Sequence, residues 1–367
     1  MRVAIIHDHL VQKGGAEAVL QVFQNIFPEA PIFTLVYDKE KMDKDFVEGN
    51  IKTSFIQKFP GGVRFFKWFL LLMPLATEKY NLNDYDVVIS NSSAFAKGVI
   101  TRPETLHLCY CHTPTRYLWT DSHLYIKELP HSGFVKSIVS LFLPRLRVWD
   151  RMAAGRVDKF IANSKTVQKR IAKYYGKESQ VIYPPIDVSK FRIFPAQENY
   201  FLAGGRLVAY KRFDLIVQAF NKLNIPLKIF GDGPELEKLK KMAKPNIEFL
   251  GKVSEEKRAE LYGKCQAFIH PQEEDFGMMV VEAMASGRPV LAYNKGGALE
   301  TVIPGKTGEF FDHQGWEPLA HEIIKFKPEK YNPEEIREHA KKFDVAEFKN
   351  KIKSLVEDSW KEFGGSI

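Results

Sequence analysis

Residues 270–287 have the sequence HPQEEDFGMMVVEAMASG, and this stretch decides the fold class. The apolar, β-favouring run at 267–270 predicts a strand, and the good helix formers at 278–285 predict a helix that ends at Ser286-Gly287. An acidic loop joins the two. The first turn of such a helix has unpaired N–H groups and a positive dipole end, so an anionic or hydroxyl-rich ligand can lie over residues 276–279.

The same alternation of strand, loop and helix recurs along the chain. Predicted strands come before glycine-containing or polar loops at 2–7, 32–37, 87–90, 106–111 and 160–164. The double proline in 181–187 predicts a linker, and a second alternation begins near Tyr200. The sequence therefore predicts an α/β protein with two doubly wound domains, at residues 1–183 and 190–345, and ligands at the carboxyl ends of the strands.

Composition narrows the class of protein. A chain of 367 residues with 45% hydrophobic residues is long enough for two globular domains. The amino-terminal residues lack a signal-peptide core, no segment has eighteen uninterrupted apolar residues, and three cysteines are too few for a disulfide framework. These features predict a cytoplasmic protein. The formal charge of +8 favours polyanionic partners, but no nucleic-acid-binding motif is present, so we expect no nucleic acid partner.

Two glutamates frame the acidic loop and the helix that follows it. Glu274 lies in the loop, and Glu282 lies about two turns into the helix. Seven residues separate them, so the two carboxylates can hold two hydroxyl-bearing groups of one ligand. Two glutamates at this spacing are also common on solvated helix faces, and the flanking residues therefore decide between these interpretations.

The flanking sequence resembles the E-x7-E motif of the retaining glycosyltransferases of family 4, through Glu274-Asp275-Phe276-Gly277 and the Glu-Ala-Met-Ala-x-Gly that follows. The resemblance implies a GT-B fold, in which two Rossmann-like domains face each other across a cleft and a final helix crosses back, so that residues 346–367 complete the first domain. It implies that Glu274 reaches the donor sugar and Glu282 the nucleotide ribose. It further implies that the remaining donor-binding residues of this stretch are Asp275, Phe276, Gly277, Met278 and Met279.

Two elements of the first domain are candidates for the same site. Gly14-Gly15 follows the first strand; two glycines there form either a simple turn or a place where backbone approaches a ligand closely. His112 ends a strand and is stopped by a Thr-Pro turn, which holds its ring rigidly. Most single histidines are structural. The resemblance implies that Gly14 and Gly15 line the donor pocket and that His112 is the active-site histidine.

The second domain supplies two cations and two candidate contacts to the base. Arg206 and Lys211 lie in the loop after the strand at 200–205 and can converge on one diphosphate, although solvated surface cations are the usual alternative. Their Gly-Arg-Leu-x5 context resembles the diphosphate-binding arginine and lysine of the family. The resemblance also implies that Val253 and Glu255 lie near the nucleotide base.

Residues 55–77 mix aromatic and aliphatic side chains with Lys58, Arg64 and Lys67. Two interpretations stay open. The stretch is either an interfacial segment that binds an anionic lipid surface, or a core helix with a basic outer edge.

The segments 109–119 and 181–187, with the Glu-Glu-Asp-Phe-Gly loop, place the resemblance closest to O-antigen mannosyltransferases. It implies transfer of mannose from GDP-mannose to a lipid-linked glycan, with retention of configuration, in lipopolysaccharide synthesis on the inner face of the cell membrane. The sequence departs from the expected pattern at Val280, where we expect proline in relatives, and this weakens the prediction of the donor.

No metal and no cofactor is predicted. Asp84-Tyr85-Asp86 resembles the motif that holds a metal–diphosphate in other glycosyltransferases, but it sits among turn-forming residues, and family 4 enzymes are generally metal-independent. The pattern 107–112 contains two histidines and two cysteines, but neighbours along a strand point to opposite faces. Two other functions remain open, a non-hydrolysing sugar-nucleotide epimerase of the same fold and a non-catalytic glycan-binding scaffold.

Overall fold

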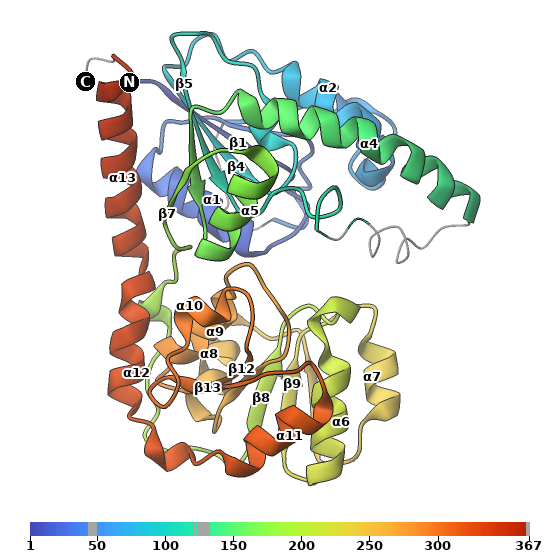
Figure 1. Ribbon diagram of the computed structural model, residues 1–367, viewed down its shortest axis with the longest axis vertical. Helices are drawn as coiled ribbons and strands as arrows, with labels where there is room; N and C mark the ends of the chain where they lie inside the picture. Colours follow the sequence, from blue (N-terminus) through green and yellow to red (C-terminus); the bar gives the residue numbers. More distant parts are fainter. Residues whose placement is uncertain (43–49, 121, 123–132, 365–367) are drawn as a thin grey trace. The chain divides into compact units, whose positions relative to one another are not determined.

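The computed structural model describes residues 1–42, 50–120, 122 and 133–364. They form two compact units, Met1–Pro185 together with Phe348–Ile367, and Ile186–Glu347. Each unit contains one sheet of parallel strands flanked by helices (Figure 1). The prediction of two doubly wound α/β domains is confirmed.

The first unit is built on a seven-stranded sheet of order β3-β2-β1-β4-β5-β6-β7. Its strands are β1 (Val3–His7), β2 (Ile32–Thr34), β3 (Ile51–Thr53), β4 (Val87–Ser92), β5 (Leu106–Cys111), β6 (Lys159–Ala162) and β7 (Ser179–Val181). Its α-helices are α1 (Gly15–Ile26), α2 (Met73–Glu78), α4 (Gly133–Gly155), α5 (Lys165–Tyr175) and α13 (Val345–Glu362).

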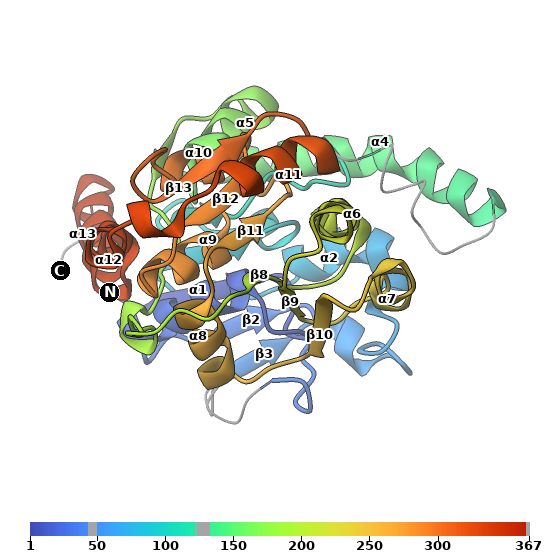
Figure 2. The ribbon, with the colours of Figure 1, turned by 90° about the horizontal axis from the view of Figure 1, so that it is seen from below.

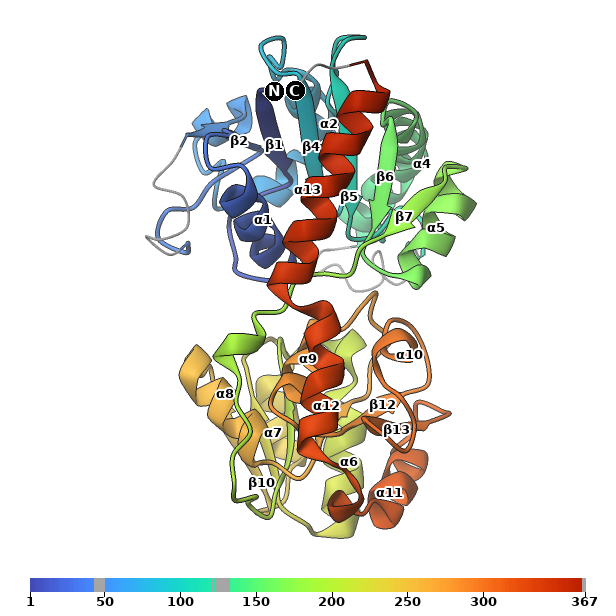
Figure 3. The same ribbon diagram turned by 90° about the vertical axis from the view of Figure 1, so that its left-hand side faces the viewer.

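The carboxyl-terminal helix α13 returns to the first unit, as the resemblance implied. Phe348 packs edge-on against Phe23 of α1 and Tyr110 of β5, with both ring centroids 5.6 Å away. Figure 3 shows α13 lying beside α1 and the strands of this sheet. The return buries an aromatic cluster that neither α1 nor β5 can cover alone, and aromatic pairs of this geometry are favourable beyond the area that they bury.

The second unit is built on a six-stranded sheet of order β10-β9-β8-β11-β12-β13. Its strands are β8 (Phe201–Gly204), β9 (Leu227–Phe230), β10 (Ile247–Gly251), β11 (Phe268–His270), β12 (Val290–Tyr293) and β13 (Gly308–Phe311). Its helices are α6 (Phe213–Leu223), α7 (Leu236–Met242), α8 (Glu255–Lys264), α9 (Met278–Ala285), α10 (Ala298–Thr301), α11 (Trp316–Lys325) and α12 (Pro333–Ala340). Figure 2 shows α6 and α11 on one side of this sheet and α8 and α9 on the other.

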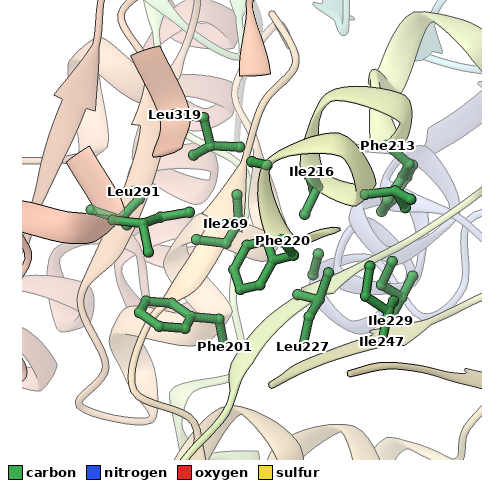
Figure 4. Close-up of a cluster of buried hydrophobic side chains, with 14 of the residues drawn as sticks. Phe201, Phe213, Ile216, Phe220, Leu227, Ile229, Ile247, Ile269, Leu291 and Leu319 are labelled. Carbon is green, nitrogen blue, oxygen red and sulfur yellow. The ribbon is translucent and has the colours of Figure 1, made fainter. Parts of the chain in front are cut away.

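The core of the second unit lies between its sheet and helices α6 and α11. Ile269 and Leu291 from the strands meet Phe220 of α6 and Leu319 of α11, all fully or almost fully buried (Figure 4). Strands covered on both faces are apolar throughout rather than alternating, which explains runs such as 290–292. Each large side chain buried here contributes about 1.5–3 kcal/mol.

Both sheets reverse their strand order beside their first strand. In the first unit the reversal lies between β1 and β4, and in the second between β8 and β11. Loops that leave neighbouring strands there run in opposite directions and open a space at the carboxyl ends of the strands, which is where ligands bind in open α/β sheets. The strand order therefore marks one candidate ligand position in each unit.

Residues 55–77 do not form the core helix that one of the two interpretations expected. They form the 3₁₀ turns Phe55–Lys58 and Phe66–Leu72, followed by α2. Ile56, Met73 and Ala76 are buried, but no residue of Phe66–Leu72 is, and Trp68 is 63% exposed. The stretch thus anchors one side in the unit and presents apolar side chains on the other. None of the described helices is long and apolar enough to span a membrane.

Candidate active site

The loops that follow β8 and β11 meet through an ion pair at the strand-order reversal of the second unit. The Lys211 ammonium lies 2.8 Å from Oε1 of Glu274. Only 9% of Lys211 is exposed, so the pair is largely shielded from water. From the sequence we expected Lys211 to bind the diphosphate and Glu274 to bind the sugar. The structure places the two side chains in direct contact.

The Glu274 carboxylate is held in its ionised form. Burial alone would raise its pKa, but the positive charge of Lys211 and the neighbouring His270 lower the pKa to about 2. The side-chain amide of Gln272 donates a further hydrogen bond to Oε1 at 3.2 Å. The site therefore presents a fixed negative charge beside a fixed positive one at neutral pH.

Glycines bring the neighbouring loops close enough to fix this pair. Gly205 has a φ of 124°, and a Cβ there would lie 3.3 Å from Lys211 Nζ and 3.2 Å from Met279 Sδ. On the other side, the N–H of Gly297 donates to the Glu274 carbonyl at 2.8 Å. A Cβ on Gly296 would lie 2.4 Å from the same carbonyl oxygen, so a larger residue would displace the acidic loop.

Helix α9 starts where the sequence predicted, at Met278, behind Gly277 in the left-handed conformation with a φ of 88°. Met278 and Met279 are half-buried at this start. The Phe276 side chain is not available to a ligand, because it is buried with its ring centroid 5.6 Å from that of Phe343. Of Phe276, only the backbone can line the site, and Asp275 is half-buried beside it.

Glu282 belongs to a second polar cluster, formed with α8. The Tyr262 hydroxyl donates to its Oε2 at 3.1 Å, and the Arg258 guanidinium lies 3.6 Å from its Oε1. Burial raises the pKa of the Glu282 carboxyl, while the charge of Arg258 acts in the opposite direction. The cluster orients the carboxylate and gives it a hydrogen-bond donor and a cation before any ligand arrives.

The other predicted residues of the second unit are more open. Arg206 is exposed, and its Nη2 lies 3.5 Å from the Tyr210 hydroxyl. Val253 is half-buried ahead of α8, and the exposed Glu255 pairs with Lys190 at 2.9 Å. Because Lys211 is already paired with Glu274, a diphosphate that binds Lys211 would share this lysine with the carboxylate. Arg206, in contrast, is open to solvent.

In the first unit, Gly14 and Gly15 follow β1 at the reversal between β1 and β4, and His112 follows the next strand, β5. Gly14 caps α1 in an extended conformation, and both Gly14 and Gly15 are exposed. Nε2 of the half-buried His112 lies 2.6 Å from Oδ1 of Asn91. Burial and the neighbouring His7 lower the pKa of His112 to about 4, so its ring is neutral at neutral pH.

Four polar residues of these surroundings were missed in the sequence. They are Asn91, His270, Arg258 and Tyr262. Asn91 and His270 carried a signal, because each is a polar residue at the end of an apolar strand. Both ring nitrogens of the buried His270 are without a hydrogen-bond partner among the described residues. Arg258 and Tyr262 gave no such signal. The sequence pattern of a helix indicates which of its faces is buried, but it does not indicate that Glu282 of another helix lies against that face.

Asp84-Tyr85-Asp86 forms part of the scaffold. Asp86 accepts a hydrogen bond from the Arg2 backbone N–H at 2.7 Å and lies 3.4 Å from the Arg2 guanidinium, while Tyr85 packs edge-on against Phe33. Within residues 1–42, 50–120, 122 and 133–364, no three His, Cys, Asp or Glu side chains are grouped so as to hold a metal ion. Cys109, Cys111 and Cys265 are buried free thiols.

Comparison with known families matches both units. Residues 31–190 match the family described as Glycosyltransferase Family 4, and residues 187–343 match Glycosyl transferases group 1. The two matches overlap at residues 187–190, just after the boundary between the units at Pro185 and Ile186.

Among individual proteins, the chain is 24% identical over 370 residues to the alpha-1,3/1,6-mannosyltransferase ALG2 of Candida glabrata, covering 83% of this chain and 78% of ALG2. It is 29% identical over 196 residues to the uncharacterized glycosyltransferase MJ1178 of Methanocaldococcus jannaschii, covering 52% and 54%. A GDP-mannose-dependent alpha-mannosyltransferase of Mycolicibacterium smegmatis is 29% identical over 182 residues, covering 46% and 48%. The chain thus spans about half the length of the last two relatives.

Among solved structures, Anabaena Alr3699/HepE in complex with UDP-glucose superposes with a TM-score of 0.73 at 18% identity, covering 98% of this chain and all of that one. At this identity the likeness extends to the fold alone.

Proposed function

The chain belongs to the glycosyltransferases, and from this premise we propose that it is a metal-independent, retaining mannosyltransferase that takes mannose from GDP-mannose. The observation that carries the proposal is the Lys211–Glu274 pair, 2.8 Å long, at the strand-order reversal of the second sheet, with the exposed Arg206 on the same loop as Lys211. A diphosphate needs cations and a hexose needs a hydrogen-bond acceptor, and this pair offers both at one point.

Each residue then has a role in the reaction. Arg206 and Lys211 stabilise the negative charge that develops on the departing diphosphate, Glu274 accepts a hydrogen bond from a hexose hydroxyl, and Glu282 accepts one from the ribose. The acceptor oxygen forms a bond to the anomeric carbon on the face that the phosphate leaves, the bond from that carbon to the phosphate oxygen breaks, and the acceptor proton passes to the departing phosphate. The anomeric configuration is retained. The fixed cations replace a metal ion, and no cofactor takes part.

Mannose is the sugar that the curated relatives favour. The printed names of ALG2 and of the Mycolicibacterium protein both specify mannosyl transfer, and the second specifies GDP-mannose. Val280, where we expected proline, lies buried in α9 between the two glutamates and leaves both carboxylates in place. We therefore assign GDP-mannose as the donor in spite of this departure.

For the acceptor we propose a lipid-linked glycan at the cytoplasmic face of a membrane, in synthesis of a cell-surface polysaccharide such as the lipopolysaccharide O-antigen. The support comes from 55–77, where Phe65 and Trp68 are 49% and 63% exposed. Lys58, Arg64 and Lys67 lie in the same stretch, which contains no acidic residue. Exposed apolar groups and cations bind an anionic lipid surface additively.

A thermal-shift screen of GDP-, UDP- and ADP-sugars tests the donor assignment. Ligand that binds only the folded state raises the unfolding temperature, so GDP-mannose should give the largest shift. Arg206→Ala should reduce that shift, while Lys327→Ala, which removes an exposed cation elsewhere in the second unit, should not. A scaffold without donor affinity would show no shift with any of the nucleotide sugars, and a larger shift with UDP- or ADP-sugars would overturn the assignment.

A further inference from the structure

A chain of polar contacts runs through the carboxyl ends of β1, β4 and β5 in the first unit. Asn91 stands at its centre. Its side chain meets His112 of the β5 loop, His7 of β1 and the backbone at the start of α1. These are buried or half-buried groups at the strand-order reversal, beside the Gly14-Gly15 loop.

The contacts fix the orientation of the Asn91 amide. Its Nδ2 lies 2.8 Å from the carbonyl oxygen of Ala16, and a carbonyl only accepts hydrogen bonds, so the amide NH₂ must face α1. The other hydrogen of this NH₂ points to Nδ1 of His7 at 3.1 Å. Oδ1 is thereby directed at Nε2 of His112, 2.6 Å away.

The amide orientation in turn fixes the proton positions of the two histidines. Because Oδ1 only accepts, Nε2 of His112 must carry a proton, and the neutral ring has its lone pair at Nδ1. Because Nδ2 only donates, Nδ1 of His7 carries none. Nε2 of His7 then faces the Glu17 carboxylate, whose Oε1 is 3.5 Å away.

We infer that Asn91 is the positioning residue of His112: it selects the tautomer with the proton on Nε2 and so leaves Nδ1 as a hydrogen-bond acceptor for a hydroxyl group of the bound sugar. The inference rests on the proposed function only for this role of His112. The tautomer itself follows from the contacts within the first unit.

The groups around His112 support a neutral ring. His7 at the end of β1 and Asp8, which follows it, act on the ring electrostatically, as does Glu17 of α1. The Asp8 carboxylate is occupied by four backbone N–H groups, from Ser93 to Ala96, at 2.6–2.9 Å. Glu17 is paired with His7, and a Cβ on Gly14 would lie 3.0 Å from its Oε2. The nearby carboxylates are therefore engaged elsewhere, and the neutral amide is the group in contact with Nε2.

NMR of the ¹⁵N-labelled full chain without any ligand tests the tautomer. The side-chain signals of His112, assigned by comparison with His112→Ala, should show the Nε2-protonated neutral form from pH 8 down to pH 5. Asn91→Asp places a carboxylate against Nε2, which stabilises the protonated ring, so its titration should move to higher pH. Asn91→Leu should give a mixture of tautomers. Asn163→Leu, which replaces a buried asparagine after the neighbouring strand β6, should leave the His112 signals unchanged.

Transfer kinetics test the role. Asn91→Leu should lower kcat on the order of tenfold with KM changed less than twofold, and it should cost nothing further in a His112→Ala background, because a residue that acts through another has no effect without it. Multiplying effects in the double variant would overturn the positioning role. An Nδ1-protonated ring in the parent, or unchanged His112 signals in Asn91→Leu, would overturn the tautomer assignment even if the chain proved to catalyse no transfer.

Discussion

The carboxylate of Glu274 links charge to stability in the second unit. Its pKa is about 2 when folded, against about 4.3 in an unfolded chain. A depressed pKa gives stability that is fully present above the unfolded value and is lost as the pH falls through the folded value. The pair with Lys211 should therefore stabilise the unit at neutral pH and cease to do so near pH 2.

We predict that Glu274→Gln lowers the free energy of unfolding by on the order of 2–3 kcal/mol above pH 5, and that the difference shrinks as the pH approaches 2. Urea unfolding of parent and variant across this range measures it. Glu273→Gln, at the exposed neighbouring position, is the matched control and should show a smaller difference. A difference for Glu274→Gln that does not vary with pH would contradict the linkage.

Substitution of Glu274 and substitution of Glu282 should impair different steps of the reaction. Glu282 sits with Tyr262 and Arg258, and Glu274 with Lys211, so the two carboxylates belong to separate clusters. We predict that Glu282→Ala weakens nucleotide binding about tenfold or more, whereas Glu274→Ala mainly lowers kcat. Calorimetric titration with GDP and steady-state kinetics separate the two effects. Equal and small effects from both substitutions would contradict the assignment of Glu274 to the sugar and of Glu282 to the ribose.

Among the elements, the stretch 55–77 has one side anchored and one side open. Ile56, Met73 and Ala76 hold it in the first unit, while Phe65 and Trp68 remain exposed. Each cation near an anionic lipid surface contributes about 1 kcal/mol to binding. Burial of the exposed apolar side chains in the lipid adds a contribution that does not depend on charge. Binding should then be weakened by salt without being abolished.

We predict that replacing Lys58, Arg64 and Lys67 with serine reduces co-sedimentation with vesicles of phosphatidylcholine and phosphatidylserine. Replacing Lys306, Lys327 and Lys330 of the second unit removes the same charge and should have little effect. Trp68→Ser should also weaken binding while leaving the unfolding temperature nearly unchanged, because this side chain is 63% exposed. If the first triple variant binds the vesicles as the parent does, the stretch is not a lipid-binding surface.

The elements show what the sequence can predict. The bounds of helix α9 were placed correctly, because helix formers and a carboxyl-terminal Ser-Gly act locally. The carboxyl end of β2 was not, since the strand predicted to reach Tyr37 stops at Thr34. The strand at 51–53 was missed, because three residues give no periodicity.

The sequence predicted which residues belong to the candidate site but not which of them are in contact. Glu274 and Lys211 were both named from their motifs, yet their pairing depends on loops that are more than sixty positions apart in the chain. The same holds for Asn91, whose partners come from β1, β5 and α1. These contacts depend on the order of the strands in the sheet. The local sequence pattern does not show which strand lies next to which.

At the scale of the whole molecule, the two units share one design. Each sheet reverses its strand order beside its first strand, and the loops at that reversal carry Gly14 and Gly15 in the first unit and Lys211 and Glu274 in the second. The chain as a whole has a formal charge of +8, which favours an anionic donor and an anionic surface over neutral partners.

We expect the complete enzyme to transfer sugar without a metal ion. In the proposed function Arg206 and Lys211 supply positive charge to the diphosphate, so we predict that EDTA leaves the transfer rate unchanged within about twofold. Assays with EDTA, with magnesium and with manganese measure this. Loss of activity in EDTA that magnesium restores would contradict the prediction and return attention to Asp84 and Asp86.

The central claim is that this glycosyltransferase opens GDP-mannose with retention. Time-resolved proton NMR of the full chain with GDP-mannose, without acceptor, follows slow donor hydrolysis and identifies the first sugar released. We predict that α-mannose and GDP appear together, before mutarotation, and that Glu274→Ala slows their release. Appearance of β-mannose, conversion of the donor to an epimeric nucleotide sugar, or turnover of UDP-glucose with GDP-mannose untouched would contradict the account.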